Sequence, residues 1–302
     1  MKRLIFEPEH EQFRETVRAF ISREIEPYSQ EWEAAGQVDR DVYRKAGEAG
    51  LLGFNVPEEF GGGGVEDFRF NVVVAEELAR SSHAAPAFTL QNDVVVPYFT
   101  SLSNEEQRAR WLPGMATGET IVAVAMTEPG AGSDLAGIKT SAVREGDDWI
   151  LNGSKTFISS GINSDIVVVV CRTNPDPAAK HKAFSLLVVE RGMEGFQRGR
   201  KLDKMGWRSS DTAELSYVDV RVPVGNLVGP ENSGFAQIAQ AFVTERSALA
   251  VQAYASAQRC LDLTLQWARD RETFGKPLIA RQSVQNTLAD MARRVDVART
   301  YV

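Results

Sequence analysis

The chain has 302 residues, which exceeds the usual size of one hydrophobic core, so we expect two or three domains. Its composition, 43% hydrophobic and 25% charged, is that of an ordinary globular protein. A net charge of −7 without blocks of Lys and Arg argues against nucleic acid as a partner.

The sequence carries no sign of export, membrane insertion or metal binding. The N-terminal residues lack a signal peptide, and no apolar run reaches the ~18 residues of a membrane span, so we expect a cytoplasmic protein with no membrane partner. Cys171 and Cys260 are too few for a disulfide framework or a cysteine zinc site. His10, His83 and His181 are scattered without ligand spacing, and we expect no metal.

Apolar residues recur at helical spacing from about residue 6 to 120, which predicts a helical region. The first amphipathic stripe consists of Phe13, Val17, Phe20, Ile21 and Ile25. Further helices are predicted over Asp39–Gly50, with Gly50 as the C-terminal cap, over Asp67–Arg80, and from a capping box at Ser103 and Glu106 toward Trp111.

Short β-rich runs follow and predict an antiparallel β domain from about Thr120 to Val228. The runs are TIVAVAMT, WILNGSKTFIS, SDIVVVVCRT, AFSLLVVE and AELSYVDVRV. Residues 145–148 and Asn152-Gly153 carry the turn signals.

Helical periodicity returns after Gly234, in a stretch too long for a typical globular helix. A second stripe has spacings of 4, 3, 4, 3 and 4 and consists of Val284, Leu288, Met291, Val295, Ala298 and Val302. No helix-stop signal follows it, so we expect a further helical segment. The predicted domains are 1–120 (N-terminal α-helical), 121–228 (middle β) and 229–302 (C-terminal α-helical, truncated).

The glycine-rich stretch TEPGAGSDLAGIKT, residues 127–140, misses both common phosphate motifs. Ile138 displaces the lysine from its place in a P-loop, and Leu135 stands where a dinucleotide motif needs its third glycine. Both motifs also require a following helix, whereas residues 139–157 predict a β-hairpin. One interpretation is a structural turn, with positive φ at Gly130 and Gly132.

A functional interpretation of the same loop is a binding site for a flat heterocycle with a polar edge. Thr127, Ser133 and Asp134 add hydroxyls and a carboxylate to exposed backbone amides, and glycine lets the backbone approach a ligand closely.

Four segments between residues 124 and 282 resemble, in order, landmarks of the acyl-CoA dehydrogenase family. They are VAMTEPGAGSDLAG, NGSKTFISSG, MGWRSSDTAEL and ARDRETFGKPLIARQ. The resemblance implies an α+β fold with an N-terminal helical domain, a middle antiparallel β-barrel and an incomplete C-terminal helical bundle. It also implies FAD as cofactor and a homotetramer, or less often a dimer.

The resemblance assigns roles to residues at matching positions. Contacts to the flavin fall on Val124, Met126, Thr127, Ser133, Phe157, Ile158 and Ser159. Contacts to the FAD of a neighbouring subunit fall on Arg271, Thr273, Phe274, Arg281 and Gln282, and contacts to substrate on Ser133, Phe242 and Arg246. From the residues alone, Phe157 also suits a buried strand position, and Arg271 also suits an exposed helix end.

Glu245 is the candidate catalytic base. Glu245 and Arg246 are the only charges in AQAFVTERSALAVQAYA, so the carboxylate has apolar neighbours on its helix, and an ion pair with a nearby Arg is the alternative to a catalytic role. The position resembles the one that isovaleryl-CoA and long-chain acyl-CoA dehydrogenases use. Other branches place the base in a C-terminal loop similar to Y-E-G-T, which these residues do not contain, and that alternative stays open.

The implied reaction removes a proton from Cα and a hydride from Cβ of an acyl-CoA, a step of fatty acid β-oxidation, and passes electrons to an electron-transferring flavoprotein. The alternatives are an acyl-CoA oxidase or flavin monooxygenase of similar architecture, and an inactive partner subunit of a hetero-oligomer. Acyl chain length and branching are not indicated.

Overall fold

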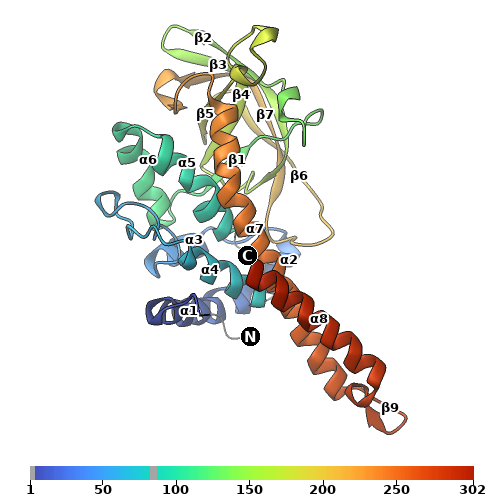
Figure 1. Ribbon diagram of the computed structural model, residues 1–302. Coiled ribbons are helices and arrows are strands. Elements are labelled where there is room, and N and C mark those ends of the chain that lie inside the picture. The colour runs from blue at the N-terminus through green and yellow to red at the C-terminus, as the bar shows by residue number, and fades with distance from the viewer. Residues whose placement is uncertain (1–3, 82–86) are drawn as a thin grey trace. The chain divides into compact units, whose positions relative to one another are not determined.

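The structure is a computed structural model that describes residues 4–81 and 87–302. The chain forms two compact units, and many of their helices and strands are labelled in Figure 1. We call Met1–Glu26, Asp67–Ala84 and Arg246–Val302 the helical unit, and Pro27–Glu66 and Ala85–Glu245 the sheet unit. The long helix α7 (Gly234–Asp270) has residues in both units, and its single continuous run confirms the long helix that the sequence predicts.

The helical unit contains α1 (Pro8–Phe20), the π-helical turn η1 (Ile21–Ile25), α4 (Arg69–Ser81), the later part of α7, β9 (Glu272–Thr273), β10 (Lys276–Pro277), η8 (Leu278–Ala280) and α8 (Gln282–Tyr301). Helix α1 packs on α4, and Val17, Phe20, Ile21 and Ile25 of the predicted stripe are buried. A second core joins α7 to α8 through Leu261, Ala268 and Leu288. The apolar stripes therefore mark the buried faces of these helices.

The helices of the N-terminal region in the sheet unit are α2 (Ser29–Ala35), α3 (Asp41–Glu48), η3 (Glu58–Phe60), η4 (Leu90–Val95), α5 (Val96–Leu102) and α6 (Glu105–Thr117), and η2 (Glu26–Tyr28) leads into them. Gly50 follows α3 with φ 71°, as its predicted capping role requires. The predicted capping box at Ser103 and Glu106 is wrong by one residue. Asn104 is the cap, because its side chain accepts the Gln107 N–H at 2.9 Å and the Gln107 side chain accepts the Asn104 N–H at 3.0 Å.

Eight strands form one sheet: β1 (Val122–Ala125), β2 (Ser141–Glu145), β3 (Asp148–Ser159), β4 (Ile166–Arg172), β5 (Phe184–Glu190), β6 (Phe196–Lys201), β7 (Thr212–Pro223) and β8 (Leu227–Val228). Their order is β6-β7-β3-β2-β4-β5-β8, with β1 paired to β4. The predicted barrel is wrong, since strand pairing among the described residues does not join β6 to β8. The prediction of purely antiparallel pairing is also wrong. Strand β4 pairs in parallel with β1 and, at Ser141 and Arg172, with β2. The β2–β3 hairpin connects β1 to β4, and β3 connects β2 to β4, so each connection is long enough for a parallel pair.

Strands β4 and β5 are buried on both faces, which explains their nearly continuous apolar sequences. Val168, Val170 and Val188 belong to a core with residues of α5 and α6. The alternate residues Val167 and Val169 belong to a second core with residues of β3 and β7. Strand β1 pairs with β4 in the same sheet and is also buried on both faces, with Val122 in the helical core and Ala123 and Ala125 in the second core.

Two turn signals have different outcomes. Gly146, with φ 62°, connects β2 and β3 in the predicted hairpin. Asn152-Gly153 is not a turn: both residues lie within β3, at an irregularity in its pairing with β7. Glycine is required there because a Cβ on Gly153 would lie 2.4 Å from the Thr140 hydroxyl oxygen.

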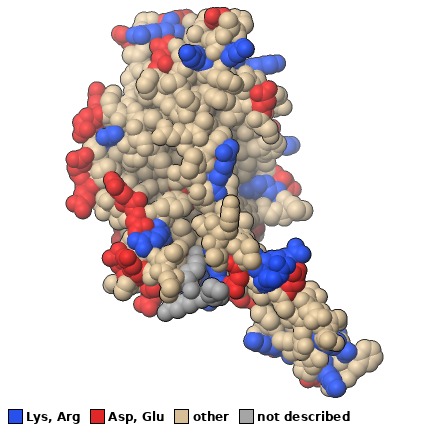
Figure 2. Space-filling view, in the orientation of Figure 1, with Lys and Arg blue, Asp and Glu red and all other residues tan. Residues whose placement is uncertain are grey.

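On the face that Figure 2 shows, basic and acidic side chains lie among one another rather than in broad fields of one sign. Within residues 4–81 and 87–302, none of the helices has both the length and the hydropathy of a membrane span.

Candidate active site

The candidate flavin-binding segment begins at strand β1. Val124 and Met126 are half-buried, and both pack against the core that contains Tyr98, Phe99 and Trp111. Thr127 follows at the end of the strand, and its C=O accepts the Thr156 N–H at 2.9 Å. This bond ties the start of the glycine-rich loop to β3, so two of the resembled segments lie side by side in the sheet unit.

A buried ion pair holds the glycine-rich loop in place. The Glu128 carboxylate accepts the Lys139 N–H at 2.8 Å, the Thr140 N–H at 2.9 Å and the Lys155 Nζ at 3.0 Å. Lys155 is fully buried and also donates to the Met126 C=O at 2.9 Å. Glu128 thus joins both ends of the loop to β3, and sequence reasoning missed this role. The sequence held a signal for it, since Glu128 and Lys155 each lie inside one of the four segments that resemble the family.

The pKa values of the pair reflect burial and mutual attraction. Burial alone would raise the pKa of Glu128, but the hydrogen bonds from Thr140 and Lys139 and the charge of Lys155 outweigh it and lower that pKa. Burial lowers the pKa of Lys155, and the charge of Glu128 opposes the shift. Glu128 is therefore an ionised structural anchor rather than a candidate base.

Gly130 lies in a turn that Glu128 and Ala131 close with two backbone hydrogen bonds of 2.8 and 3.1 Å, as the structural interpretation of the loop expects, but the turn does not require glycine at Gly130 or Gly132. The predicted positive φ is wrong, because neither residue is among the positive-φ glycines, and a Cβ on either would meet no atom within 4 Å. Ser133 beside them is exposed. Asp134 accepts the Ala136 N–H at 3.1 Å and caps η5 (Leu135–Gly137), so its carboxylate has a local structural partner. The open backbone at the two glycines fits close approach by a flat ligand.

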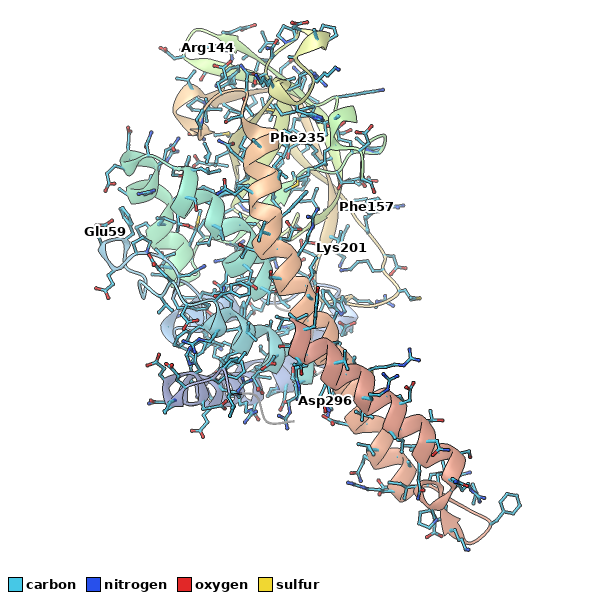
Figure 3. All side chains as sticks on the ribbon, in the orientation of Figure 1. Glu59, Arg144, Phe157, Lys201, Phe235 and Asp296 are labelled. Atoms are coloured by element: carbon cyan, nitrogen blue, oxygen red, sulfur yellow. The ribbon has the colours of Figure 1, made fainter. Side chains whose placement is uncertain are left out.

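Phe157 is exposed and strained. It lies where the pairing of β3 with β7 shifts register, its φ is 60°, and 67% of its surface is exposed (Figure 3). The buried-strand interpretation is therefore wrong. An aromatic residue with positive φ is unusual and marks a position that the fold over-determines. Ile158 is buried in the sheet core, so only its backbone can reach a ligand, whereas Ser159 is half-buried.

Glu245 lies on α7 near the same helical core as β1. It is partly buried, and Phe242, one turn earlier, packs against the core that Val124 and Met126 contact. The buried Tyr98 is close enough for the Glu245 charge to act on it: burial, then this charge, raises the pKa of Tyr98. Among the described residues, the Tyr98 hydroxyl has no hydrogen-bond partner. Sequence reasoning missed Tyr98, since nothing in its local pattern distinguishes it from a core residue.

The remaining predicted residues lie in the helical unit, most of them on or beside the irregular segment between α7 and α8, and Arg246 on α7 itself. Arg271 follows the last residue of α7 and is exposed, as both interpretations of it require. A short hairpin of β9 and β10 turns at Phe274, which is 97% exposed with φ 50°. Arg281 donates to the Thr273 C=O and hydroxyl, each at 2.7 Å, and its guanidinium lies 5.4 Å from the Phe274 ring centroid. Gln282 begins α8 and is exposed, as is Arg246.

A cavity of about 590 Å³ in the helical unit is lined by none of these residues. Its charged groups pair with one another: Arg14 donates to Glu76 and Glu77, each at 2.8 Å, and Tyr254 donates to Glu76 at 2.7 Å. We therefore interpret it as a structural ion-pair network rather than as the candidate site.

One group in the described part of the chain has the spacing of metal ligands: Glu7, Glu9 and His10. His10 uses both ring nitrogens, since Nδ1 accepts the Glu7 N–H at 3.1 Å and Nε2 lies 3.2 Å from the Asp67 carboxylate. This group forms the start of α1. His181 stacks on Phe235, and His83 lies outside the described residues.

Family models match the chain in three successive parts: the acyl-CoA dehydrogenase N-terminal domain over residues 7–119, the middle domain over 123–220 and the C-terminal domain over 232–302. The chain is 45% identical over 300 residues to the long-chain specific acyl-CoA dehydrogenase, mitochondrial, of Rattus norvegicus, covering 99% of this chain and 70% of the relative. The chain belongs to the acyl-CoA dehydrogenase family. It is therefore an enzyme of the oxidoreductase class.

Solved structures agree with this assignment. The acyl-CoA dehydrogenase of Geobacillus kaustophilus matches with a TM-score of 0.97 and 44% identity, over 99% of this chain and 79% of that one. An acyl-CoA dehydrogenase from Bacillus anthracis, solved in complex with FAD, matches with a TM-score of 0.88 and 30% identity, over 98% of this chain and 50% of that one. The predicted family and its helix, sheet, helix architecture are confirmed. The domain boundaries and the roles of individual residues stay predictions.

Proposed function

We propose that this acyl-CoA dehydrogenase family member carries out FAD-dependent α,β-dehydrogenation of an acyl-CoA thioester to a trans-2-enoyl-CoA. The observation that carries the proposal is the common core of β1 and α7. Val124 and Met126, assigned to the flavin, and Phe242, one turn from the candidate base Glu245, pack against the same buried cluster. One packed core thus contacts both the strand proposed to face the flavin and the turn of α7 that precedes the carboxylate.

The residues of the sheet unit fit FAD. The open backbone at Gly130 and Gly132 accepts close approach, Val124, Met126 and Phe157 offer apolar contacts, and the hydroxyls of Thr127, Ser133 and Ser159 and the backbone of Ile158 offer polar partners. When bound, FAD supplies the acceptor for the hydride from Cβ. In this proposal Phe157 stacks on the ring, which explains an exposed aromatic residue held with positive φ.

Glu245 is the base that takes the proton from Cα onto a carboxylate oxygen. Apolar neighbours on α7 and the adjacent core restrict water around it, which suits proton abstraction from a weak carbon acid. Ser133, Phe242 and Arg246 contact the substrate. Arg246 is exposed, as a group that meets a large charged ligand must be.

The segment between α7 and α8 binds the phosphate end of an FAD held by another subunit. Guanidinium groups bond two phosphate oxygens at once, and Arg271 and Arg281 supply two of them beside Thr273, Phe274 and Gln282. The working enzyme is then a homotetramer, or a dimer. We further propose an electron-transferring flavoprotein as the electron acceptor and the cytoplasm as the location.

The experiment is anaerobic reduction of the FAD-loaded protein by acyl-CoAs of differing length and branching, followed by exposure to air. Long straight chains belong in the panel first, because of the similarity to a long-chain specific enzyme. We expect loss of the oxidised flavin absorbance, formation of enoyl-CoA and slow reoxidation in air. Absence of reduction by every acyl-CoA contradicts the proposal, and rapid reoxidation with peroxide release indicates an oxidase instead.

A further inference from the structure

Asp211 lies in the third resembled segment, MGWRSSDTAEL, to which no ligand role is assigned. It directly precedes β7 and is 3% exposed. A carboxylate so deeply buried requires hydrogen-bond partners, because an unsatisfied buried charge is costly. Its partners identify what it does.

Asp211 binds the N–H groups of one turn, residues 160–163. Its backbone C=O accepts the Ser160 N–H at 2.9 Å. Its Oδ2 accepts the Ile162 N–H at 2.7 Å and the Asn163 N–H at 3.3 Å. One residue thus satisfies three backbone donors of the turn.

The turn follows Phe157–Ser159 without interruption. Phe157 and Ser160 have φ values of 60° and 57°, so two L-residues in this short stretch adopt the left-handed region. Such a conformation persists only where surrounding bonds hold it. Before Phe157, the Thr156 N–H bonds to Thr127, and after Ser159, Asp211 holds the chain. Phe157 is therefore clamped from both sides.

Arginine side chains hold the carbonyl groups of the same turn. Arg191 donates to the C=O groups of Ile162 and Asn163, each at 2.9 Å, and Arg198 donates to the Gly161 C=O at 3.1 Å. The two arginines thus satisfy three C=O groups of the turn, and Asp211 satisfies three of its N–H groups; the remaining Gly161 N–H bonds to the Ile158 C=O at 3.2 Å. Without the Asp211 side chain, the buried N–H groups of Ile162 and Asn163 lose their acceptor, and the arginines cannot supply one because guanidinium groups only donate hydrogen bonds.

We propose that Asp211 is a positioning residue for the flavin-facing segment Phe157–Ser159, acting through its hydrogen bonds to the turn at residues 160–163. The inference rests on the proposed function for the identity of the ligand. It assigns a role to the third segment. Asp211, directly before β7, supplies the acceptors for the turn that follows β3, and that turn positions the Phe157 ring and the Ser159 hydroxyl.

A charge-based role for Asp211 makes different predictions. Lys204 donates to the neighbouring Ser210 C=O at 2.6 Å, and its charge acts on Asp211. Burial raises the pKa of Asp211, and the hydrogen bonds from Ile162 and Asn163 oppose the shift. Asp211→Asn keeps an acceptor in place without the charge, whereas Asp211→Glu keeps the charge and moves the acceptor. The two substitutions separate the two roles.

The test compares Asp211→Ala, Asp211→Asn, Asp211→Glu and the control Asp203→Ala, an 89% exposed carboxylate on the loop before β7. FAD affinity is measured by titration of the apoprotein, and amide hydrogen exchange is measured over residues 156–163 without FAD. We expect Asp211→Ala and Asp211→Glu to weaken FAD binding by about tenfold or more, because the buried Ile162 and Asn163 N–H groups lose a well-placed acceptor and the turn no longer holds Phe157–Ser159. Their turn amides exchange faster. Asp211→Asn keeps an acceptor for the turn, and Asp203→Ala leaves the turn's hydrogen bonds in place, so both stay within about twofold of wild type.

Wild-type FAD affinity in folded Asp211→Ala overturns the proposal, as does rescue by Glu but not by Asn. If Asp211→Ala does not fold, the Asn variant decides: a tenfold loss of FAD affinity in that folded variant refutes positioning by the acceptor, and wild-type affinity supports it. Failure of the wild-type protein to bind FAD refutes the proposed function instead. The exchange measurement needs no flavin and still reports whether Asp211 holds the turn.

Discussion

Lys155→Met tests whether the buried pair with Glu128 holds the glycine-rich loop. The substitution preserves the apolar stem of the side chain but removes the ammonium, which donates to Glu128 at 3.0 Å and to the Met126 C=O at 2.9 Å. Glu128 then keeps two backbone N–H bonds and loses its countercharge in a site from which water is excluded. Breaking one partner of a buried pair costs about 3–5 kcal/mol.

The expected change in thermal stability follows from this free energy. At about 2–4 °C per kcal/mol for a chain of this size, Tm falls by roughly 6–20 °C. The control is Arg221→Met, which breaks an exposed pair with Glu145 at 3.6 Å that contributes about 0–1 kcal/mol. The double variant Glu128→Gln/Lys155→Met removes both charges and recovers most of the loss.

Calorimetry of the apoprotein and FAD titration together provide the assay. We expect Lys155→Met to lower both Tm and FAD affinity, because the displaced loop carries Thr127 and Ser133. Equal effects of Lys155→Met and Arg221→Met on Tm would refute the reasoning, as would a double variant less stable than Lys155→Met alone.

Three further predictions concern single groups. Phe157→Gly removes the strain of a left-handed φ, so the free energy of unfolding changes by less than about 1 kcal/mol. FAD affinity falls roughly 2–10-fold, because the stacking of the ring is lost. A large drop in Tm with unchanged FAD affinity contradicts this prediction. Tyr98→Phe removes a buried hydroxyl that has no partner in the described part of the chain, so the free energy of unfolding in urea stays unchanged or rises. The control Tyr43→Phe loses a hydrogen bond from the Ala87 N–H at 3.2 Å and lowers that free energy by about 1 kcal/mol. A larger loss of stability in Tyr98→Phe than in Tyr43→Phe would contradict this. The pKa of Glu128 is lower in the folded protein than the unfolded value of 4.5, so ionised Glu128 stabilises the fold above pH 4.5 and this contribution is lost as pH falls through the folded pKa. The free energy of unfolding of Glu128→Gln should therefore fall less steeply with decreasing pH than that of the wild type. The same pH dependence in both proteins would contradict the lowered pKa.

The order of helical region, sheet and helical region could be predicted from the spacing of apolar residues alone. The buried face of a helix repeats about every 3.6 residues and that of a strand every 2, whichever element packs against it. Val17, Phe20 and Ile25 illustrate this, since each lies on the predicted stripe and is buried. The barrel and the purely antiparallel pairing could not be predicted correctly, because strand order depends on which edges meet after the chain has crossed over. The parallel pairs of β4 lie far apart in sequence and leave no local signal.

A local motif predicts the structure correctly when only one backbone conformation or one capping position fits it. When two fit, contacts from elsewhere in the chain decide between them. Asn152-Gly153 suits a tight turn as well as an irregular strand, and close approach by Thr140 selects the strand. Asn104 and Ser103 are both good helix caps, and the reciprocal bond to Gln107 selects Asn104.

The candidate site shows the same limit of sequence reasoning. The segments proposed to face the flavin were found by resemblance, but the residues that support them were not. Glu128, Lys155 and Asp211 lie within the resembled segments, and their roles depend on hydrogen bonds between strands distant in sequence. Polarity in a local pattern does not show whether a carboxylate acts as base, anchor or positioning group. Burial and partners do.

The most direct test of the central claim is the anaerobic reaction of FAD-loaded Glu245→Gln with an acyl-CoA that bleaches the wild-type flavin, with Glu231→Gln, an exposed carboxylate before α7, as control. We expect the Glu245 variant to bind FAD and acyl-CoA normally but to form no enoyl-CoA, with a loss on the order of 100-fold or more because general-base catalysis contributes 10²–10⁴-fold. The control should react as wild type. Wild-type flavin reduction in Glu245→Gln would contradict the account and place the base elsewhere.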